Sequence, residues 1–374
     1  MIKPFAKPIY VTRPFLPPLE EFRQGLEEIW ENKWLTNNGP ILKRFNRELS
    51  DIFETENLCL FNNGTLALQI ALQAMGISGE VITTPYTFVA TTHALFWNNI
   101  SPVFVDIEPD YYTIDPEKVE AAITPRTTAI LAVHVYGHPC KLNALADIAQ
   151  RHNLKLIYDA AHAFGTEVGD KSIAHFGDLS MFSFHATKLF HSLEGGMLIF
   201  KEAGLKGKLD YLKNFGFKNE VEVVMSGTNA KMNEMQALMG IQILNYLEEI
   251  IQKRAKITKV YRECLRKVPG IRLVPAPSSD IRYNYAYMPI EVDEQEFGMS
   301  RDDLYERFKQ WNVHARRYFY PLVCDYACYR SIPVNDSLTV ARRVAGRILT
   351  LPIYDSLKLS EVEAICEIIK SFQG

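Results

Sequence analysis

The sequence has few cysteines, and they follow no pattern that would pair them or bind a metal. Its 374 residues include six cysteines, none of them in a CxxC arrangement. Cys324 and Cys328 are closest in sequence, but no histidine or cysteine at ligand spacing completes a zinc set. Scattered cysteines in a chain of this length favour reduced thiols over a disulfide framework. The sequence therefore predicts a protein of a reducing compartment, the cytoplasm, without a metal site.

Long hydrophobic runs and an excess of either charge are also missing. The longest apolar stretches have the length of a strand, which is too short to span a membrane. The proline-rich first 18 residues lack the apolar core of a signal peptide. Lysine and arginine total 41 against 44 aspartate and glutamate, a formal charge of −3. This balance gives no electrostatic reason to expect DNA, RNA or an anionic membrane as a partner.

What the sequence does contain is a long alternation of short apolar runs with helical segments. Strands that are apolar throughout and alternate with helices indicate a mainly parallel sheet covered on both faces, an α/β fold. Helical spacing over 19–32 and 41–53 frames the loop WLTNNGP. The predicted strands are 58–61, 80–83, 101–105, 129–133, 155–158, 179–183 and 197–200, and further helices are predicted over 65–75, 88–98, 115–123, 141–152 and 227–247.

Beyond residue 247 the pattern changes, with strands grouped among fewer helices. A long helix over 248–267 leads into this region. We therefore predict a large α/β domain over 1–247 and a smaller α+β domain over 248–374, which the first residues of the chain are candidates to join. After the long helix we expect strands near 272–274 and 283–290, a helix over 301–310, a strand through ARRYFYPL at 315–322 and a final helix from about 360.

Ligands on such a sheet bind beyond the carboxyl ends of its strands, so the residues that follow the strands are candidates for a site. Gly64 and Thr65 follow the strand at 58–61 and open a helix. Free N–H groups at a helix start suit a phosphate, and the Thr65 hydroxyl adds a donor. An ordinary helix cap remains the alternative interpretation for this turn.

Three further side chains follow strands in the same manner. Asp159 and His162 come after 155–158, and Lys188 comes after 179–183. Taken singly, each has a plain alternative as a cap, a packed histidine or an exposed loop lysine. A lysine beside an apolar pocket can form a Schiff base, however, and pyridoxal phosphate requires such a lysine, a carboxylate for its ring nitrogen and a phosphate anchor. Phe88, after the strand at 80–83, can supply an aromatic face.

At this point the sequence resembles a known family over nearly its whole length. It is similar to the sugar aminotransferases of the DegT/DnrJ/EryC1/StrS group, which are fold type I pyridoxal phosphate enzymes. The matching segments are WLTNNGP, NNGTLAL, ITTPYTFVATTHA, PVFVDIEPDYYTIDPEKVEAAITPRTTAI, VHVYGHPC, IYDAAHAFG, GDLSMFSFHATK, LEGG and GTNAKMNEMQA.

The resemblance implies a role for each candidate residue. Lys188 would be the Schiff-base lysine, Asp159 would pair with the ring nitrogen, and Phe88 would stack on the ring. Phosphate contacts would come from Gly64, Thr65 and Ser183, and from Asn229 of the neighbouring subunit of a homodimer.

One position departs from the family pattern and another bears on the activity. His162 stands where the family often has a glutamine that contacts the ring hydroxyl. A neutral histidine can still donate there, with a pH dependence that glutamine would lack. Family members that act as sugar dehydratases carry histidine in place of the lysine, so the presence of Lys188 favours transamination.

The resemblance also suggests the substrates. The amino donor would be L-glutamate, and the acceptor a nucleotide-linked keto-sugar. TNNGP, ITTPYTFVATTHA, VHVYGHPC and SFHATK look most like enzymes that aminate C4 of dTDP-4-keto-6-deoxy-D-glucose for O-antigen and other surface glycans. Candidate sugar and pyrophosphate contacts, each with plain packing or a solvated charge as the alternative, are Thr36, Asn37, His185, Arg316 and Tyr320.

Alternatives remain open for the activity. Because no spacing argument identifies the ring carbon, amination at C3 of a dTDP-3-keto-6-deoxyhexose is one of them. A pyridoxal phosphate-binding regulator without turnover is another, although no basic stretch or DNA-binding segment supports it. A lyase or an epimerase on the same fold is the third.

Overall fold

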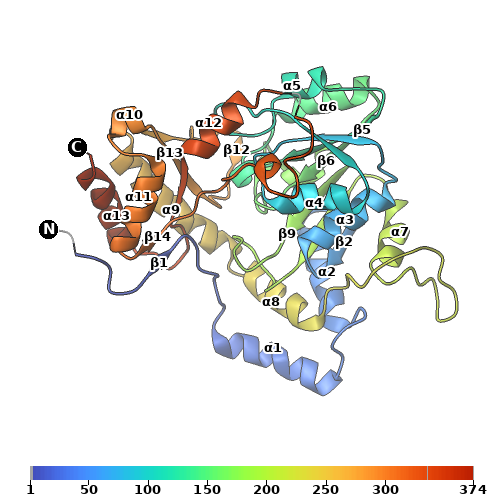
Figure 1. The fold of residues 1–374 in the computed structure, drawn as a ribbon. Helices are drawn as coiled ribbons and strands as arrows, with labels where there is room; N and C mark the ends of the chain where they lie inside the picture. The colour runs from blue at the N-terminus through green and yellow to red at the C-terminus, as the bar shows by residue number, and fades with distance from the viewer. Residues whose placement is uncertain (1–2, 335, 374) are drawn as a thin grey trace.

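A seven-stranded sheet forms the centre of the first two-thirds of the chain (Figure 1). The computed structural model describes residues 3–334 and 336–373. All neighbouring strands are parallel except β10, which is antiparallel to both of its neighbours, so the predicted mainly parallel sheet is confirmed. The order across the sheet is β2 (Leu58–Phe61), β10 (Gly196–Phe200), β9 (Leu179–Ser183), β6 (Lys155–Asp159), β5 (Thr127–Val133), β3 (Glu80–Thr83) and β4 (Ser101–Phe104).

Most residues of the sheet are buried because helices cover both of its faces. Alternate residues of β2 point to opposite sides: Leu58 and Leu60 join one apolar cluster, and Cys59 and Phe61 join another. The first cluster contains residues of α1 (Leu19–Asn32), α2 (Pro40–Ile52), α6 (Leu142–Arg151) and α8 (Glu234–Leu244). The first cluster also includes Val119 of α5 (Pro116–Ala121). The second cluster contains residues of α3 (Gly64–Ala74), α4 (Val89–Trp97) and α7 (Leu205–Leu212).

The later part of the chain builds a separate apolar cluster around a small antiparallel sheet. The N-terminal strand β1 (Ile9–Tyr10) pairs in parallel with β14 (Val313–His314), so the first residues do join this unit. Its three-stranded sheet has the order β11 (Ile271–Leu273), β13 (Met288–Val292) and β15 (Ile348–Leu351), and its helices are α10 (Glu294–Phe297), α11 (Arg301–Gln310), α12 (Thr339–Arg347) and α13 (Leu359–Ser371).

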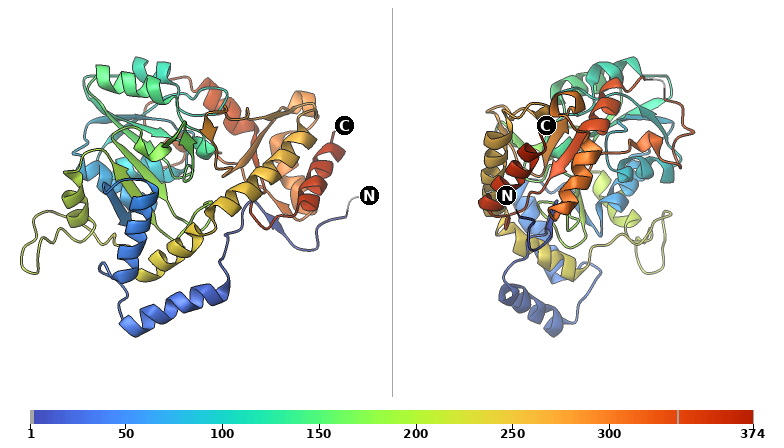
Figure 2. Two further views of the ribbon diagram at one scale, coloured as in Figure 1. Left: turned by 180° about the vertical axis from the view of Figure 1, so that it is seen from behind. Right: turned by 60° about the vertical axis from the view of Figure 1, so that its left-hand side comes forward.

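One long helix passes between the two units. In Figure 2, α9 (Leu247–Leu265) runs from the larger unit into the smaller one. Its Ile250 packs in the core of the large unit, whereas its Tyr261 packs in the core of the small one. The predicted domain boundary at 247/248 stays a prediction, and the structure adds that α9 belongs to both cores.

Three predicted elements differ from the structure in their bounds or in kind. The strand expected over 283–290 begins only at Met288, where β13 starts. The helix expected from residue 227 begins at Glu234, because the Asn233 side chain accepts the Gln236 N–H and caps it there. The expected strand at 315–322 is absent apart from a single bridge between Arg316 and Thr350. Pro321 has no N–H to donate to a sheet, and the chain turns just before it.

Candidate active site

A cavity of about 640 Å³ lies beyond the carboxyl ends of β2, β6 and β9. This is the edge of a parallel sheet at which ligands bind. The sequence-predicted residues that line the cavity are Gly64, Thr65, Phe88, Asp159, His162, Ser183, His185 and Lys188.

One end of the cavity is built to hold an anion. The helix α3 begins at Gly64, and the N–H groups of Gly64 and Thr65 have no acceptor inside the helix. A Cβ atom on Gly64 would lie 3.1 Å from Cβ of Ser183, so glycine lets the helix start close against β9. The hydroxyl groups of Thr65 and Ser183 therefore lie beside free N–H donors and the positive end of a helix dipole.

A buried carboxylate lies at another wall of the cavity. Asp159 ends β6 and is 5% exposed. The Thr91 hydroxyl donates to Oδ2 over 2.7 Å, and the Ala161 N–H donates to Oδ1 over 3.1 Å. Burial raises the pKa of Asp159, while these two bonds and the charge of Lys188 act in the opposite direction. A cationic N–H group in the cavity would offset the cost of keeping this carboxylate charged.

Lys188 is half-buried and lines the same cavity as Asp159. Its Nζ donates to the hydroxyl of Tyr287 over 3.3 Å. Across residues 3–334 and 336–373, no carboxylate lies within ion-pair distance of this amine. The amine is thus held by one weak, neutral contact, which leaves it free to react with a bound group.

The structure fixes the tautomer of His162. Nδ1 of His162 accepts the backbone N–H of Tyr136 over 3.2 Å, so the proton of the neutral ring resides on Nε2. The ring stacks on Phe319, with centroids 5.7 Å apart and planes 8° apart. Burial, together with the charge of Lys188, lowers the pKa of His162 well below its usual value. Burial and the Lys188 charge thus favour the neutral imidazole at physiological pH, so we expect no titration of His162 in that range.

Replacing His162 with glutamine is accordingly expected to leave the pH profile of cofactor affinity unchanged between about pH 6.5 and 8. Both side chains are neutral donors in this range, because the pKa of His162 lies below it. Titration of pyridoxal phosphate into wild type and His162→Gln at several pH values measures this. An inflection near pH 6.5 in the wild type alone would contradict a neutral His162.

The cavity also contains residues that the sequence did not identify. Tyr287, Tyr318 and Phe319 come from the small unit, and Thr12 comes from the N-terminal segment. None of them follows a strand of the large sheet, so the position after a strand end, which identified the other site residues, does not identify these. Their one sequence signal is the density of tyrosine and phenylalanine in YNYAYMP and ARRYFYPL.

The remaining predicted residues do not line this cavity within one chain. Thr36 and Asn37 are exposed in the loop before α2. Arg316 is exposed, although its backbone pairs with Thr350, a residue of the cavity wall. The ring of Tyr320 lies under Arg301 and Arg317.

Asn229 is also exposed and outside the cavity. Its Oδ1 accepts from Lys231 Nζ over 2.9 Å, and it lies ahead of the Asn233 cap of α8. The cap of α8 is thus Asn233, and Asn229 does not cap this helix.

In the part of the chain that the structure describes, no three side chains among His, Cys, Asp and Glu are grouped to hold a metal ion. Within the same residues, every helix is too short or too polar to cross a bilayer.

Comparison with known proteins identifies the family. Residues 19–370 match the DegT/DnrJ/EryC1/StrS aminotransferase family. The chain is 46% identical to a dTDP-4-amino-4,6-dideoxy-D-glucose transaminase of Shigella dysenteriae, over 98% of this chain and all of that relative. It is 45% identical to the Escherichia coli transaminase of the same name, over 97% of this chain and 98% of the relative.

The fold agrees with this result. The crystal structure of DesI in the presence of its TDP-sugar product superimposes with a TM-score of 0.94 at 35% identity. The match covers 99% of this chain and 94% of that one. The predicted α/β fold of an aminotransferase is thus confirmed, and the chain belongs to the DegT/DnrJ/EryC1/StrS aminotransferase family.

Proposed function

We propose that this aminotransferase uses pyridoxal phosphate to move an amino group from L-glutamate to C4 of dTDP-4-keto-6-deoxy-D-glucose. The product would be dTDP-4-amino-4,6-dideoxy-D-glucose, the sugar named for the two relatives of 45–46% identity. The observation that carries the proposal is that Lys188, Asp159 and the start of α3 line one cavity. The free cysteines of the described residues agree with an enzyme of the cytoplasm, and we assign the product to O-antigen or other surface-glycan synthesis.

The donor set of the cavity fits pyridoxal phosphate. Gly64, Thr65 and Ser183 offer N–H and hydroxyl donors for a phosphate, and Asp159 offers a carboxylate for a ring N–H. Phe88 is 58% exposed and lines the cavity, so its ring is open to stacking. When bound, the cofactor supplies an electron-withdrawing ring that stabilises negative charge on the carbon next to the transferred nitrogen.

The protein residues then perform the binding and the proton transfers. Asp159 keeps a proton on the ring nitrogen, because a buried carboxylate favours a cationic partner. Lys188 Nζ takes a proton from the α-carbon of the amino donor and later returns one to C4 of the sugar. The Tyr287 hydroxyl, 3.3 Å from that amine, orients it. His162 would donate from Nε2 to the ring hydroxyl, because its Nδ1 already accepts from Tyr136.

We further propose a homodimer in which each subunit completes the cavity of the other. The segment between α7 and α8 projects from the body of the chain in both figures (Figures 1 and 2). It carries exposed apolar side chains, among them Phe215, Phe217 and Val221, the last 94% exposed. A soluble chain buries such a surface against a partner. Asn229 lies at the end of this segment, which supports its contact with the partner's phosphate.

The proposed sharing predicts a specific result in mixed dimers. A tagged Lys188→Ala chain combined with a tagged Asn229→Ala chain would place both changes in one site and leave the other intact. The mixed dimer should recover about half of the wild-type activity, because one of its two sites is unaltered. Assays of the doubly purified mixed species measure this. Activity at half that of the Asn229→Ala homodimer would instead mean that each chain builds its own site.

The substrate is tested by product analysis. We would incubate the enzyme with L-glutamate and a panel of dTDP- and UDP-linked 3-keto and 4-keto sugars, and locate the new amino group by NMR. Amination at C4 of the dTDP-linked 4-keto sugar, with release of 2-oxoglutarate, is the expected outcome. An amino group at C3 would establish the 3-aminotransferase alternative. Absence of 2-oxoglutarate with every sugar would favour a lyase, an epimerase or a regulator.

A further inference from the structure

A fourth apolar cluster joins the two units behind the cavity. The large unit contributes Tyr86, Tyr112 and Tyr136, and all three are fully buried. The small unit contributes Phe319 and Val344 among others. Three tyrosine hydroxyl groups in one apolar cluster need hydrogen-bond partners, so their contacts show what this junction holds in place.

Two of these hydroxyl groups converge on one backbone carbonyl. The oxygen of Tyr318 lies 3.2 Å from the Tyr86 hydroxyl and also accepts from the Tyr136 hydroxyl. The two hydroxyl oxygens are 2.6 Å apart. Each hydroxyl has one proton, so two of the three contacts are hydrogen bonds at any moment. In every such arrangement the Tyr318 carbonyl accepts at least one bond, and Tyr318 is part of the cavity wall.

Tyr136 also contacts the cavity in two other ways. Its backbone N–H donates to Nδ1 of His162, and its ring stacks on Phe319 with planes 9° apart and centroids 6.1 Å apart. Its φ is +57°, which is unusual for a bulky residue and persists only where the surroundings determine it. One residue therefore holds both His162 and the wall that packs against His162.

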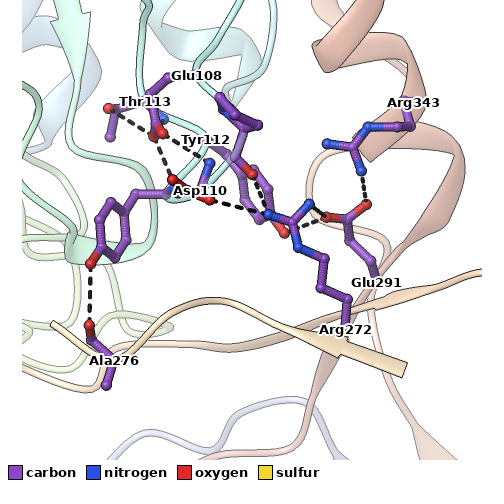
Figure 3. Close-up of polar contacts among 10 residues, drawn as sticks. Glu108, Asp110, Tyr112, Thr113, Arg272, Ala276, Glu291 and Arg343 are labelled. Carbon is purple, nitrogen blue, oxygen red and sulfur yellow. Dashed lines mark hydrogen bonds and ion pairs between the residues drawn. The ribbon is translucent and has the colours of Figure 1, made fainter. Parts of the chain in front are cut away.

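The third tyrosine is anchored by the buried carboxylate of Glu291, which two partly exposed arginines also contact (Figure 3). The Tyr112 hydroxyl donates to Oε1 of Glu291 over 2.7 Å. Arg272 and Arg343 pair with the two oxygens of this carboxylate at 3.1 and 2.5 Å. The ring of Tyr112 meets those of Tyr86 and Tyr136 edge to face, at 6.0 and 6.3 Å. The small unit thus holds the outer side of the tyrosine cluster as well.

We propose that Tyr86 and Tyr136 are positioning residues whose hydroxyl groups hold the Tyr318–Phe319 wall of the cavity against His162. They touch neither substrate nor cofactor and act through the Tyr318 carbonyl and the ring of Phe319. Loss of the hydroxyl groups would loosen the wall, and the cavity would then bind less tightly. The inference rests on the proposed function only in taking pyridoxal phosphate as the ligand of the cavity.

The test uses Tyr86→Phe, Tyr136→Phe and their double variant in the full-length chain. Tyr261→Phe is the matched control, because Tyr261 is equally buried and its hydroxyl also donates to a backbone oxygen, that of Pro352 at 3.1 Å. Hydrogen–deuterium exchange of peptides covering 315–324, with and without pyridoxal phosphate, measures how often the backbone of the Tyr318–Phe319 wall opens. Titration with pyridoxal phosphate reports affinity, and thermal unfolding reports stability.

We expect the double variant to exchange roughly fivefold faster over 315–324 and to bind pyridoxal phosphate roughly fivefold more weakly, the effect of about one lost hydrogen bond. The control should also lose stability, but it should change neither the exchange over 315–324 nor the affinity for pyridoxal phosphate. Exchange that stays at the level of the control would overturn the proposal, as would faster exchange with unchanged affinity. If the wild type binds no pyridoxal phosphate, the proposed function fails, and exchange over 315–324 still decides whether the hydroxyl groups hold the wall.

Discussion

Lys188→Ala is expected to abolish transamination while the chain keeps its fold. The variant removes the amine that carries out the proton transfers, a loss of at least about 10³-fold in rate. It should fold because Lys188 is half-buried and makes one weak side-chain hydrogen bond, to Tyr287. Release of 2-oxoglutarate from L-glutamate measures the activity, and circular dichroism with thermal unfolding checks the fold.

The identity of the reactive lysine can be established independently. Borohydride should attach pyridoxal phosphate to the lysine that holds it, and peptide mapping should then find the label on Lys188. Lys171→Ala is a suitable control, because Lys171 is exposed and its amine packs over the ring of Phe176 outside the cavity. A label on any other lysine, or an active Lys188→Ala chain, would refute the assignment.

Asp159→Asn is expected to weaken cofactor binding and to slow both half-reactions by at least about tenfold, or 1.4 kcal/mol of barrier. Asparagine keeps the shape of the side chain and can still accept from Thr91 or Ala161, but it loses the charge that keeps the ring nitrogen protonated. Single-turnover rates with L-glutamate and with the keto-sugar measure the two half-reactions separately.

A second aspartate separates this effect from loss of a cap. Asp178 accepts the Leu156 N–H over 2.8 Å near the opposite end of β6, where it has a purely structural contact. Asp178→Asn should therefore lower stability without changing the two rates. If Asp159→Asn turns over within about threefold of the wild type, less than ~1 kcal/mol of barrier, then Asp159 is only a cap as well.

The small unit departs most from what its sequence predicts, and these departures have a common cause. The helix α12 and the strand β15 were not predicted, and 315–322 was predicted as a strand. In the seven-stranded sheet of the large unit, by contrast, most strands are short runs that are buried along their length, so local composition identifies them. In the small unit α12 buries only one face, and β15 follows it directly, so no turn signal separates the helix from the buried strand. Tertiary contacts therefore outweigh the local preferences of these segments.

The sequence by itself determined the large sheet and the residues that follow its strands. Gly64, Asp159 and Lys188 could be found because parallel strands that end at one edge bring their next residues together, whatever lies around them. Only the tertiary structure decided what faces these residues. Tyr287 and Phe319 reach the cavity through packing of the small unit, and a backbone N–H of Tyr136 selects the tautomer of His162. Such contacts join residues far apart in the chain, and no local pattern encodes them.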